Sequence, residues 1–183
     1  SRDSAVRRWN VETRVCEHIF SGHGSSPVNA VAISKDGSDV FSGGGREDGM
    51  LCHYRWGDVS GMKHTWENGV AVKTGPAEGS YVRIRTFVAP RMPGTENINS
   101  KKIPAHPGGV SDIVMSSDER FVYSAGADCS VKQWSVDTGA LLAEFPNAHS
   151  GGVTSLSLLP NVAKSPRAVG TAAVAFQAAA AAG

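Results

Sequence analysis

The sequence predicts an all-β protein built from small, repeated sheets of short antiparallel strands, and three observations support this prediction. Apolar runs are short, and 21 glycines and nine prolines are spread between them, as is typical of strands and turns. The pattern Asp-x-x-Val-basic-x-Trp occurs at 3–9 and again at 128–134. His106 and His149 are 43 residues apart, which is enough for one unit of four short strands.

The unit at 106–145 shows the expected elements in order. Polar turns separate its apolar runs, one of Ser-Ser-Asp-Glu and one of Asp-Thr-Gly. Alternation of apolar runs with such turns indicates consecutive antiparallel strands. Four strands are expected, at 110–115, 121–123, 131–134 and 140–145.

Units of this kind divide the chain into a repeat region at 1–160 and a tail at 161–183. Within the repeat region we expect a partial unit at 1–20, a unit at 23–66, a unit at 106–145 and a partial unit at 149–176. The two partial units resemble the back and front halves of one unit, so their pairing would close a ring. The tail is rich in alanine, and it holds either a weak strand or a disordered low-complexity segment.

Residues 67–104 interrupt the repeat. Trp56 and His106 are 50 residues apart, whereas Trp134 and His149 are only 15 apart, so about 35 extra residues lie here. The stretch is either a degenerate unit or an inserted hairpin and loop that carries a contact surface. We favour the insertion.

Three features recur in the units at 23–66 and 106–145. A histidine precedes the first strand, a serine and an aspartate flank the turn after the second, and a tryptophan closes the third. These features resemble the WD-repeat β-propeller family, with this chain as a fragment or a divergent member. The resemblance implies propeller blades of four antiparallel strands, in an incomplete or small propeller. The family's aspartate after the tryptophan is absent, because Asn10, Gly57 or Ser135 stands there.

The resemblance also implies a buried polar network in each unit. A buried indole N–H needs an acceptor, which a serine hydroxyl supplies. In the family, the serine meets the histidine and the histidine meets the aspartate. The implied networks are His23, Ser42, Asp48 and Trp56 in one unit, and His106, Ser124, Asp128 and Trp134 in the other.

Catalytic, metal and cofactor sites are not expected. Ser, His and Asp together are also the residues of a hydrolase triad, but the set occurs twice and no Gly-x-Ser-x-Gly elbow is present. The three cysteines, Cys16, Cys52 and Cys129, form no CxxC pair, which argues against a zinc site and a disulfide framework. The chain is therefore expected not to be an enzyme and to have no cofactor.

The cysteine spacing, charge and hydropathy together indicate an intracellular protein without membrane or specific nucleic-acid partners. Lys and Arg total 18 against 17 Asp and Glu, so no strong field attracts an anionic partner. No apolar run approaches the roughly 20 residues that span a bilayer. We expect a cytoplasmic location, with the nucleus and the cytoskeleton left open. The chain does not begin with Met, so we expect a fragment of a longer chain. Either the assembly is small or open, or its remaining blades lie in sequence not included here.

The expected function is that of a protein–protein interaction scaffold within a multi-protein complex. The alternatives are a substrate-receptor subunit of a ubiquitin ligase and, with less support, a propeller-based enzyme. Aromatic and arginine side chains are enriched at interface hot spots, and residues 81–88 alternate as a strand does. The candidate partner-binding residues are Trp66, Tyr81, Arg83, Arg85 and Phe87, the last four being expected on one strand face.

Overall fold

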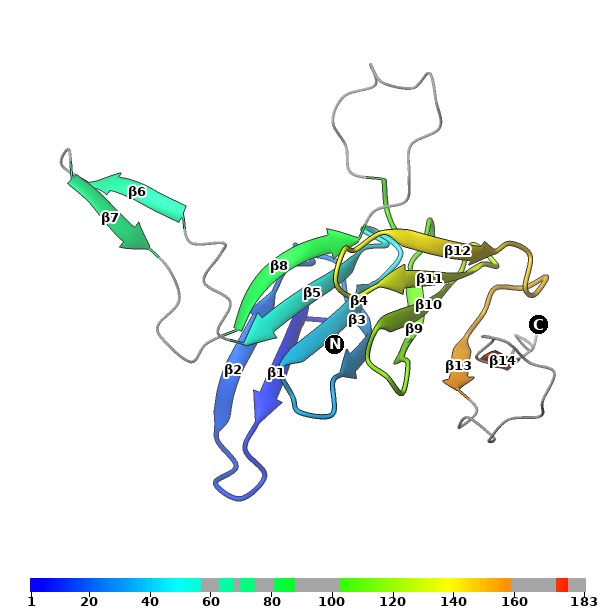
Figure 1. Ribbon diagram of the computed structural model, residues 1–183, viewed down its shortest axis with the longest axis horizontal. Coiled ribbons are helices and arrows are strands. Elements are labelled where there is room, and N and C mark those ends of the chain that lie inside the picture. Colours follow the sequence, from blue (N-terminus) through cyan, green and yellow to red (C-terminus); the bar gives the residue numbers. More distant parts are fainter. Residues whose placement is uncertain (57–62, 68–69, 75–80, 88–102, 159–173, 178–183) are drawn as a thin grey trace, which may run out of the picture.

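The protein consists of β-strands joined by turns and loops (Figure 1). The computed structural model describes residues 1–56, 63–67, 70–74, 81–87, 103–158 and 174–177. These residues contain no helix, and so none that could cross a membrane. The all-β fold predicted from the sequence is confirmed.

Two four-stranded antiparallel sheets form the centre of the molecule. Blade 1 consists of β3 (Val28–Ile33), β4 (Asp39–Gly44), β5 (Leu51–Trp56) and β8 (Tyr81–Phe87). Blade 2 consists of β9 (Val110–Met115), β10 (Phe121–Gly126), β11 (Val131–Ser135) and β12 (Leu141–Phe145). Both follow the same meander, because polar turns return the chain beside the preceding strand.

A two-stranded sheet lies on each side of these blades. The N-terminal half-sheet pairs β1 (Ala5–Trp9) with β2 (Cys16–Ser21), and the C-terminal half-sheet pairs β13 (Ser155–Leu158) with β14 (Val174–Gln177). The half-sheets lie at opposite ends of the molecule (Figure 1). They do not pair with each other, so the ring closure considered from the sequence is absent among the described residues. Within the alanine-rich tail at 161–183, the described residues are those of β14.

The interrupting stretch at 67–104 divides into different structures. A hairpin of β6 (Lys63–Glu67) and β7 (Val70–Thr74) leaves blade 1 after β5 and projects from it (Figure 1). β8 then returns and pairs with β5 along its whole length. The fourth strand of blade 1 therefore lies within the range that the sequence interpretation assigned to an insertion.

Three apolar clusters hold the sheets together, one at each contact between neighbours. The cluster between blades 1 and 2 is the largest, with Phe41, Leu51 and Phe87 on one side and Val122 and Trp134 on the other. A second cluster joins the N-terminal half-sheet to blade 1, and a third joins blade 2 to β13. Each sheet thus buries its faces only against its neighbours, as expected of stacked repeat units.

Candidate functional site: buried polar networks and a rim cleft

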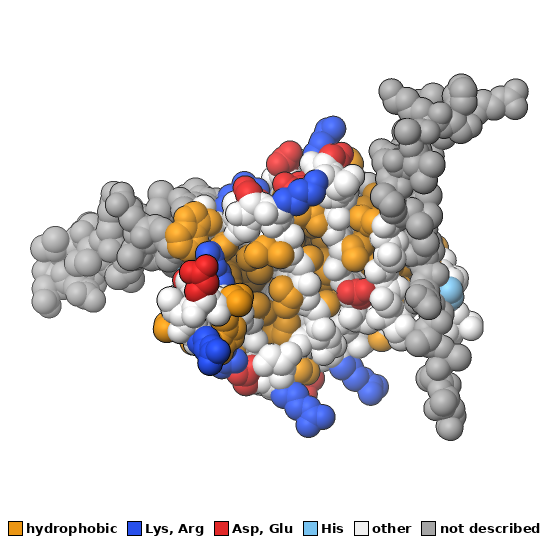
Figure 2. Space-filling model, turned by 90° about the horizontal axis from the view of Figure 1, so that it is seen from below, with side chains coloured by type: hydrophobic (Ala, Val, Ile, Leu, Met, Phe, Trp, Pro, Cys, Tyr) orange, Lys and Arg blue, Asp and Glu red, His pale blue; other side chains and the backbone are white. Residues whose placement is uncertain are grey.

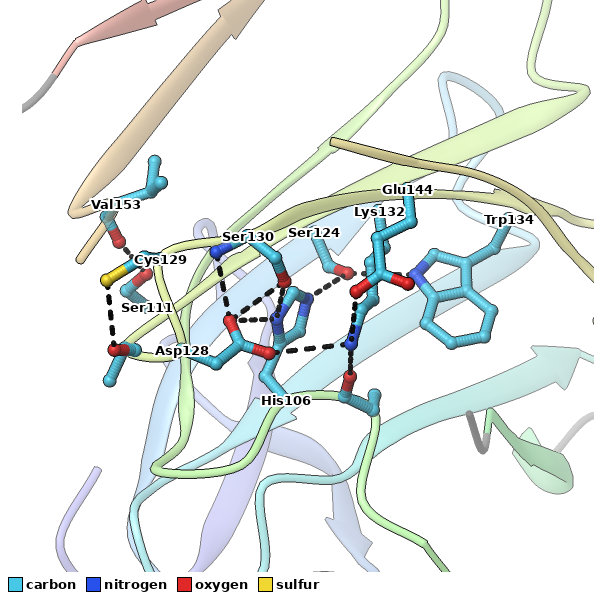
Figure 3. A network of polar contacts seen from close by, with 12 residues as sticks. His106, Ser111, Ser124, Asp128, Cys129, Ser130, Lys132, Trp134, Glu144 and Val153 are labelled. Carbon is cyan, nitrogen blue, oxygen red and sulfur yellow. Dashed lines mark hydrogen bonds and ion pairs between the residues drawn. The ribbon is translucent and has the colours of Figure 1, made fainter. Parts of the chain in front are cut away.

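Blade 2 contains a continuous chain of hydrogen bonds among four side chains (Figure 3). Trp134 Nε1 donates to Ser124 Oγ at 2.8 Å, and Ser124 Oγ lies 2.7 Å from His106 Nε2. His106 Nδ1 lies 2.9 Å from Asp128 Oδ1. The serine, the imidazole and the indole are fully buried, so each polar atom needs the partner that the chain of bonds supplies.

Two residues that the sequence interpretation did not single out extend this network (Figure 3). Ser130 donates to Asp128 from its Oγ, at 2.9 Å. The buried Lys132 donates to the carbonyl oxygen of Ala105 at 2.7 Å and lies 3.4 Å from Asp128 Oδ2. Burial alone would raise the pKa of Asp128, but the hydrogen bond and charge of His106 outweigh it and lower the pKa to about 2.

Glycines make room for the two histidines. A Cβ at Gly126 would lie 2.5 Å from the His106 ring, and a Cβ at Gly44 would lie 1.8 Å from Asp48 Oδ1. Each glycine ends the second strand of its blade. No local sequence pattern shows that an imidazole will pack against the backbone at these positions.

Blade 1 brings together three of its four expected residues. His23 Nε2 lies 2.7 Å from Ser42 Oγ, and His23 Nδ1 lies 2.9 Å from Asp48 Oδ2. Burial disfavours protonation of His23, but its interactions with Asp48 and Cys52 outweigh burial and raise its pKa to about 9. The imidazole of His23 is therefore in its protonated, positively charged form at neutral pH.

Trp56 is not part of the blade 1 network with His23, Ser42 and Asp48. The expectation that it would be was wrong. Strand register places Tyr54 opposite Val40, just as Trp134 lies opposite Val122 in blade 2. Trp56 is two residues further on and is 45 % exposed. The sequence spacing indicates this difference between the two tryptophans. Trp134 follows Asp128 by six positions, whereas Trp56 follows Asp48 by eight.

Tyr54 occupies the position in blade 1 that Trp134 occupies in blade 2, but it bonds to a different partner. Its ring is buried, and its hydroxyl donates to the carbonyl oxygen of Ser21 in the N-terminal half-sheet, at 3.3 Å. Burial raises the pKa of Tyr54, so the phenol stays neutral and acts as a donor. Trp56 instead lies edge-on to Tyr81, at 4.8 Å between ring centroids, with the guanidinium of Arg8 over its ring.

The candidate partner-binding residues on β8 do not share a face. The register of β5 and β8 shifts between His53 and Tyr54, and such a bulge inverts the alternation of side chains. Tyr81 is consequently buried against the N-terminal half-sheet, and Phe87 is buried against blade 2. The expectation of a common exposed face on β8 was wrong.

The other three candidates have different surroundings. Arg85 is half-buried and donates to the carbonyl oxygen of Val136 at 2.9 Å. Arg83 is exposed and donates to the carbonyl oxygen of Gly22 at 3.2 Å. Trp66 lies on β6, and its side chain is outside what the structure describes.

A cleft of about 320 Å³ lies between β2 and β8, and it contains Arg83. One wall is a continuous stretch of β2 and the other combines β5 and β8. The lining residues are His18, Ile19, Phe20, Ser21, Tyr54, Tyr81 and Arg83. Partial burial and the charge of Arg8 lower the pKa of His18, so Arg83 supplies the charge of this cleft.

The stacked four-stranded sheets, each containing a buried His and Ser and a half-buried Asp, have the architecture of β-propeller blades. The profile of the WD domain, G-beta repeat, matches residues 14–55 and 98–135. These ranges cover the first three strands of blade 1, except for Trp56, and the first three strands of blade 2. These two segments match the WD-repeat family.

Two named relatives have limited similarity to the chain. Human U3 small nucleolar RNA-interacting protein 2 is 28% identical over 69 residues, which cover 38% of this chain and 14% of that protein. Human kinesin-like protein KIF21B is 23% identical over 154 residues, which cover 78% of this chain and 9% of that protein. The chain thus spans a small part of each relative.

Solved structures share the fold. A structure titled "Structure of U3-55K" superimposes with a TM-score of 0.53 at 21% identity, over 85% of this chain and 37% of that one. "Crystal structure of RRP9 WD40 repeats" gives a TM-score of 0.55 at 22% identity, over 85% of this chain and 36% of that one. The arc of sheets in this chain therefore resembles about a third of a larger WD40 structure.

Proposed function

We propose that the chain is part of a propeller that holds other proteins together in a multi-protein complex. The observation that carries the proposal is where the chain places its polar and apolar groups. Its Ser-His-Asp sets are enclosed between sheets, whereas many large apolar side chains are exposed. The face in Figure 2 shows hydrophobic side chains gathered centrally, with acidic and basic side chains around them. Exposed apolar surface with a polar rim favours protein contact.

The proposed role is non-catalytic. A hydrolase serine needs to be reachable by its substrate, and its base needs to be available to take the serine's proton. Ser42 and Ser124 are fully buried, and Ser124 Oγ already accepts the indole N–H of Trp134. These contacts support a structural role for both serines, in which they stabilise the packing of each blade.

The relatives' names favour a place in a large assembly. One relative is named for its interaction with a small nucleolar RNA, and another is named kinesin-like. The first name does not support the expected cytoplasmic location, and it does not support the expected absence of nucleic acid from the complex. We propose an intracellular complex, with the nucleolus as the first location to examine.

The rim cleft between β2 and β8 is the proposed contact site. It combines aromatic walls from Phe20, Tyr54 and Tyr81 with the exposed guanidinium of Arg83. Tyrosine and arginine are among the residue types enriched at interface hot spots. The ubiquitin-ligase alternative stays a prediction with less support, since none of the Trp sites ends in Trp-Asp-x-Arg.

The test is affinity purification of the tagged chain with quantitative mass spectrometry. We expect Arg83→Glu to lose most co-purifying proteins, because it reverses the charge of the cleft. Arg46→Glu is the matched control, since Arg46 is also exposed but lies in the loop between β4 and β5. An unchanged partner set for Arg83→Glu would contradict the cleft as the contact site. A wild-type chain with no reproducible partners would contradict the scaffold role.

A further inference from the structure

The rim cleft lies at a position that apolar side chains fill at the next contact between sheets. Strand register pairs Tyr54 with Arg83 in blade 1, directly after a bulge. It pairs Trp134 with Leu141 in blade 2, also directly after a bulge. Trp134 and Leu141 pack in the apolar cluster between blades 1 and 2, whereas Tyr54 and Arg83 line the cleft. The cleft therefore lies where an arginine takes the place of a packed leucine.

The side chain of Arg83 is held against the backbone at this cleft. Its Nη1 donates to the carbonyl oxygen of Gly22 at 3.2 Å. A Cβ at Gly22 would lie 3.0 Å from that Nη1 and 2.5 Å from the hydroxyl oxygen of Tyr54, so the glycine makes room for both groups. The bond to Gly22 uses one of the five N–H donors of the guanidinium. A guanidinium that is already oriented loses less conformational freedom when a ligand binds.

The charge of the cleft is positive and is not neutralised by the described residues. None of the described residues that line the cleft is acidic, and Arg83 forms no ion pair with a described carboxylate. Nearby, Arg8 does pair with Glu17, at 3.3 Å. Partial burial and the charge of Arg8 lower the pKa of His18, so that imidazole adds no charge at neutral pH. The cleft therefore offers one cationic group to an anionic ligand.

A carboxylate is the anion that this cleft fits best. A guanidinium is planar and binds a carboxylate through two parallel N–H donors. Nucleic acids are bound through several phosphates, and phosphorylated peptides by clusters of arginines. Arg83 is the one lysine or arginine among the described residues that line the cleft. The volume of about 320 Å³ is near the lower end of the range of roughly 300–1,000 Å³ for ligand sites, so it suits side chains rather than a folded element.

We propose that the rim cleft binds an acidic segment of a partner protein, with the carboxylate of a glutamate or an aspartate on the guanidinium of Arg83. This inference rests on the proposed scaffold function and gives the chemistry of its contact site. The aromatic walls limit the access of water to one side of the ion pair, and a lower local dielectric strengthens its hydrogen bonds. Because β2 and β8 are edge strands of neighbouring sheets (Figure 1), the segment would bind at the outer rim.

An NMR titration of the 183-residue chain with a capped peptide, acetyl-Gly-Leu-Glu-Leu-Gly-amide, tests the proposal. The backbone amide signals of Phe20 and Gly22 report binding at the cleft. The matched ligand is the same peptide with glutamine in place of glutamate, which has the same shape without the charge. We expect the glutamate peptide to bind about ten-fold more tightly or better, because only its carboxylate forms a charge-assisted pair.

Three variants locate the binding. Arg83→Gln should reduce the affinity for the glutamate peptide to that for the glutamine peptide. Gly22→Ala keeps the charge but places a methyl group against Arg83 and Tyr54, so it should also weaken binding. Arg46→Gln is the control, since it removes the same charge from an exposed arginine in the loop between β4 and β5, and it should bind as the wild type does. Circular dichroism checks that each variant remains folded.

The outcomes separate this inference from the scaffold role. Equal affinity for the two peptides, no binding of the glutamate peptide, or wild-type affinity in Arg83→Gln would overturn the proposal. Tighter binding of a phosphoserine version of the peptide would overturn the assignment of a carboxylate. If the peptides fail while Arg83→Glu still loses co-purifying proteins, the acidic segment is wrong and the scaffold role stands. If the glutamate peptide binds but no proteins co-purify with the wild type, the scaffold role fails instead.

Discussion

Blades 1 and 2 share strand order, turn positions and the histidine–serine–aspartate core, yet they close that core differently. In blade 2 the indole of Trp134 is buried and donates to Ser124 within the same sheet. In blade 1 Tyr54 stands in that place and donates to Ser21 in the neighbouring sheet. The difference shows that the imidazole–carboxylate pair is the constant part of the unit. The aromatic donor varies, provided that its polar atom finds an acceptor.

The largest expected effect comes from removing the indole of blade 2. Trp134→Ala should lower the free energy of unfolding by about 3–5 kcal/mol, because it leaves a cavity in the main apolar cluster and removes a donor from Ser124. Trp56→Ala should cost about 1 kcal/mol, since that ring is 45 % exposed and packs mainly against Tyr81. Urea unfolding measures both values. Equal losses of unfolding free energy for the two variants would mean that Trp56 stabilises blade 1 as much as Trp134 stabilises blade 2.

The blade 1 network should make stability depend on pH. Because the folded pKa of His23 is raised to about 9, its contribution is fully present below pH 6.5, the ordinary pKa of histidine. Between pH 6.5 and 9 the folded protein holds this proton and the unfolded chain does not, so the free energy of unfolding should fall as pH rises, by at most about 1.4 kcal/mol per pH unit. Burial raises the pKa of the adjacent Cys52 thiol, but His23 outweighs burial and lowers it, and this acts in the opposite direction and reduces the slope. Urea unfolding at several pH values measures this slope.

The variant Asp48→Asn tests whether His23 causes the dependence of the free energy of unfolding on pH. It removes the charge that favours the imidazolium, so stability should become flatter between pH 6.5 and 9. In blade 2 the pKa of Asp128 is lowered to about 2, so its contribution is present above about pH 4 and is lost as pH falls through 2. An alkaline slope that survives Asp48→Asn would assign it to a group other than His23.

The smallest expected effect concerns the tyrosine hydroxyl. Tyr54→Phe should lower the free energy of unfolding by about 1 kcal/mol, because it removes one neutral hydrogen bond and leaves the carbonyl oxygen of Ser21 without that donor. Tyr123→Phe in blade 2 provides a matched control for removing a hydroxyl from a buried tyrosine. If Tyr54→Phe costs no more than Tyr123→Phe, the bond between blade 1 and the N-terminal half-sheet adds no stability.

Local patterns were sufficient to predict the strands of blade 2, whereas its polar network was implied by the resemblance to the WD-repeat family. Alternating apolar residues and polar turns lie within a few positions of each other, so their meaning does not depend on distant parts of the chain. The equally local spacing between Asp48 and Tyr54 also pointed to the blade 1 aromatic, but the presence of a tryptophan two residues later drew the prediction to Trp56. A residue type is therefore a weaker guide than its distance from the turn.

The sequence by itself determined an all-β protein of repeated four-stranded units, each with a histidine, a serine and an aspartate at set distances. Only the tertiary structure decided that β8 completes blade 1, that a bulge turns Tyr81 and Phe87 to opposite faces, and that Gly44 and Gly126 admit the imidazole rings. The physical reason is that register and burial arise between strands far apart in the chain. One shifted residue reverses which side chains reach the core.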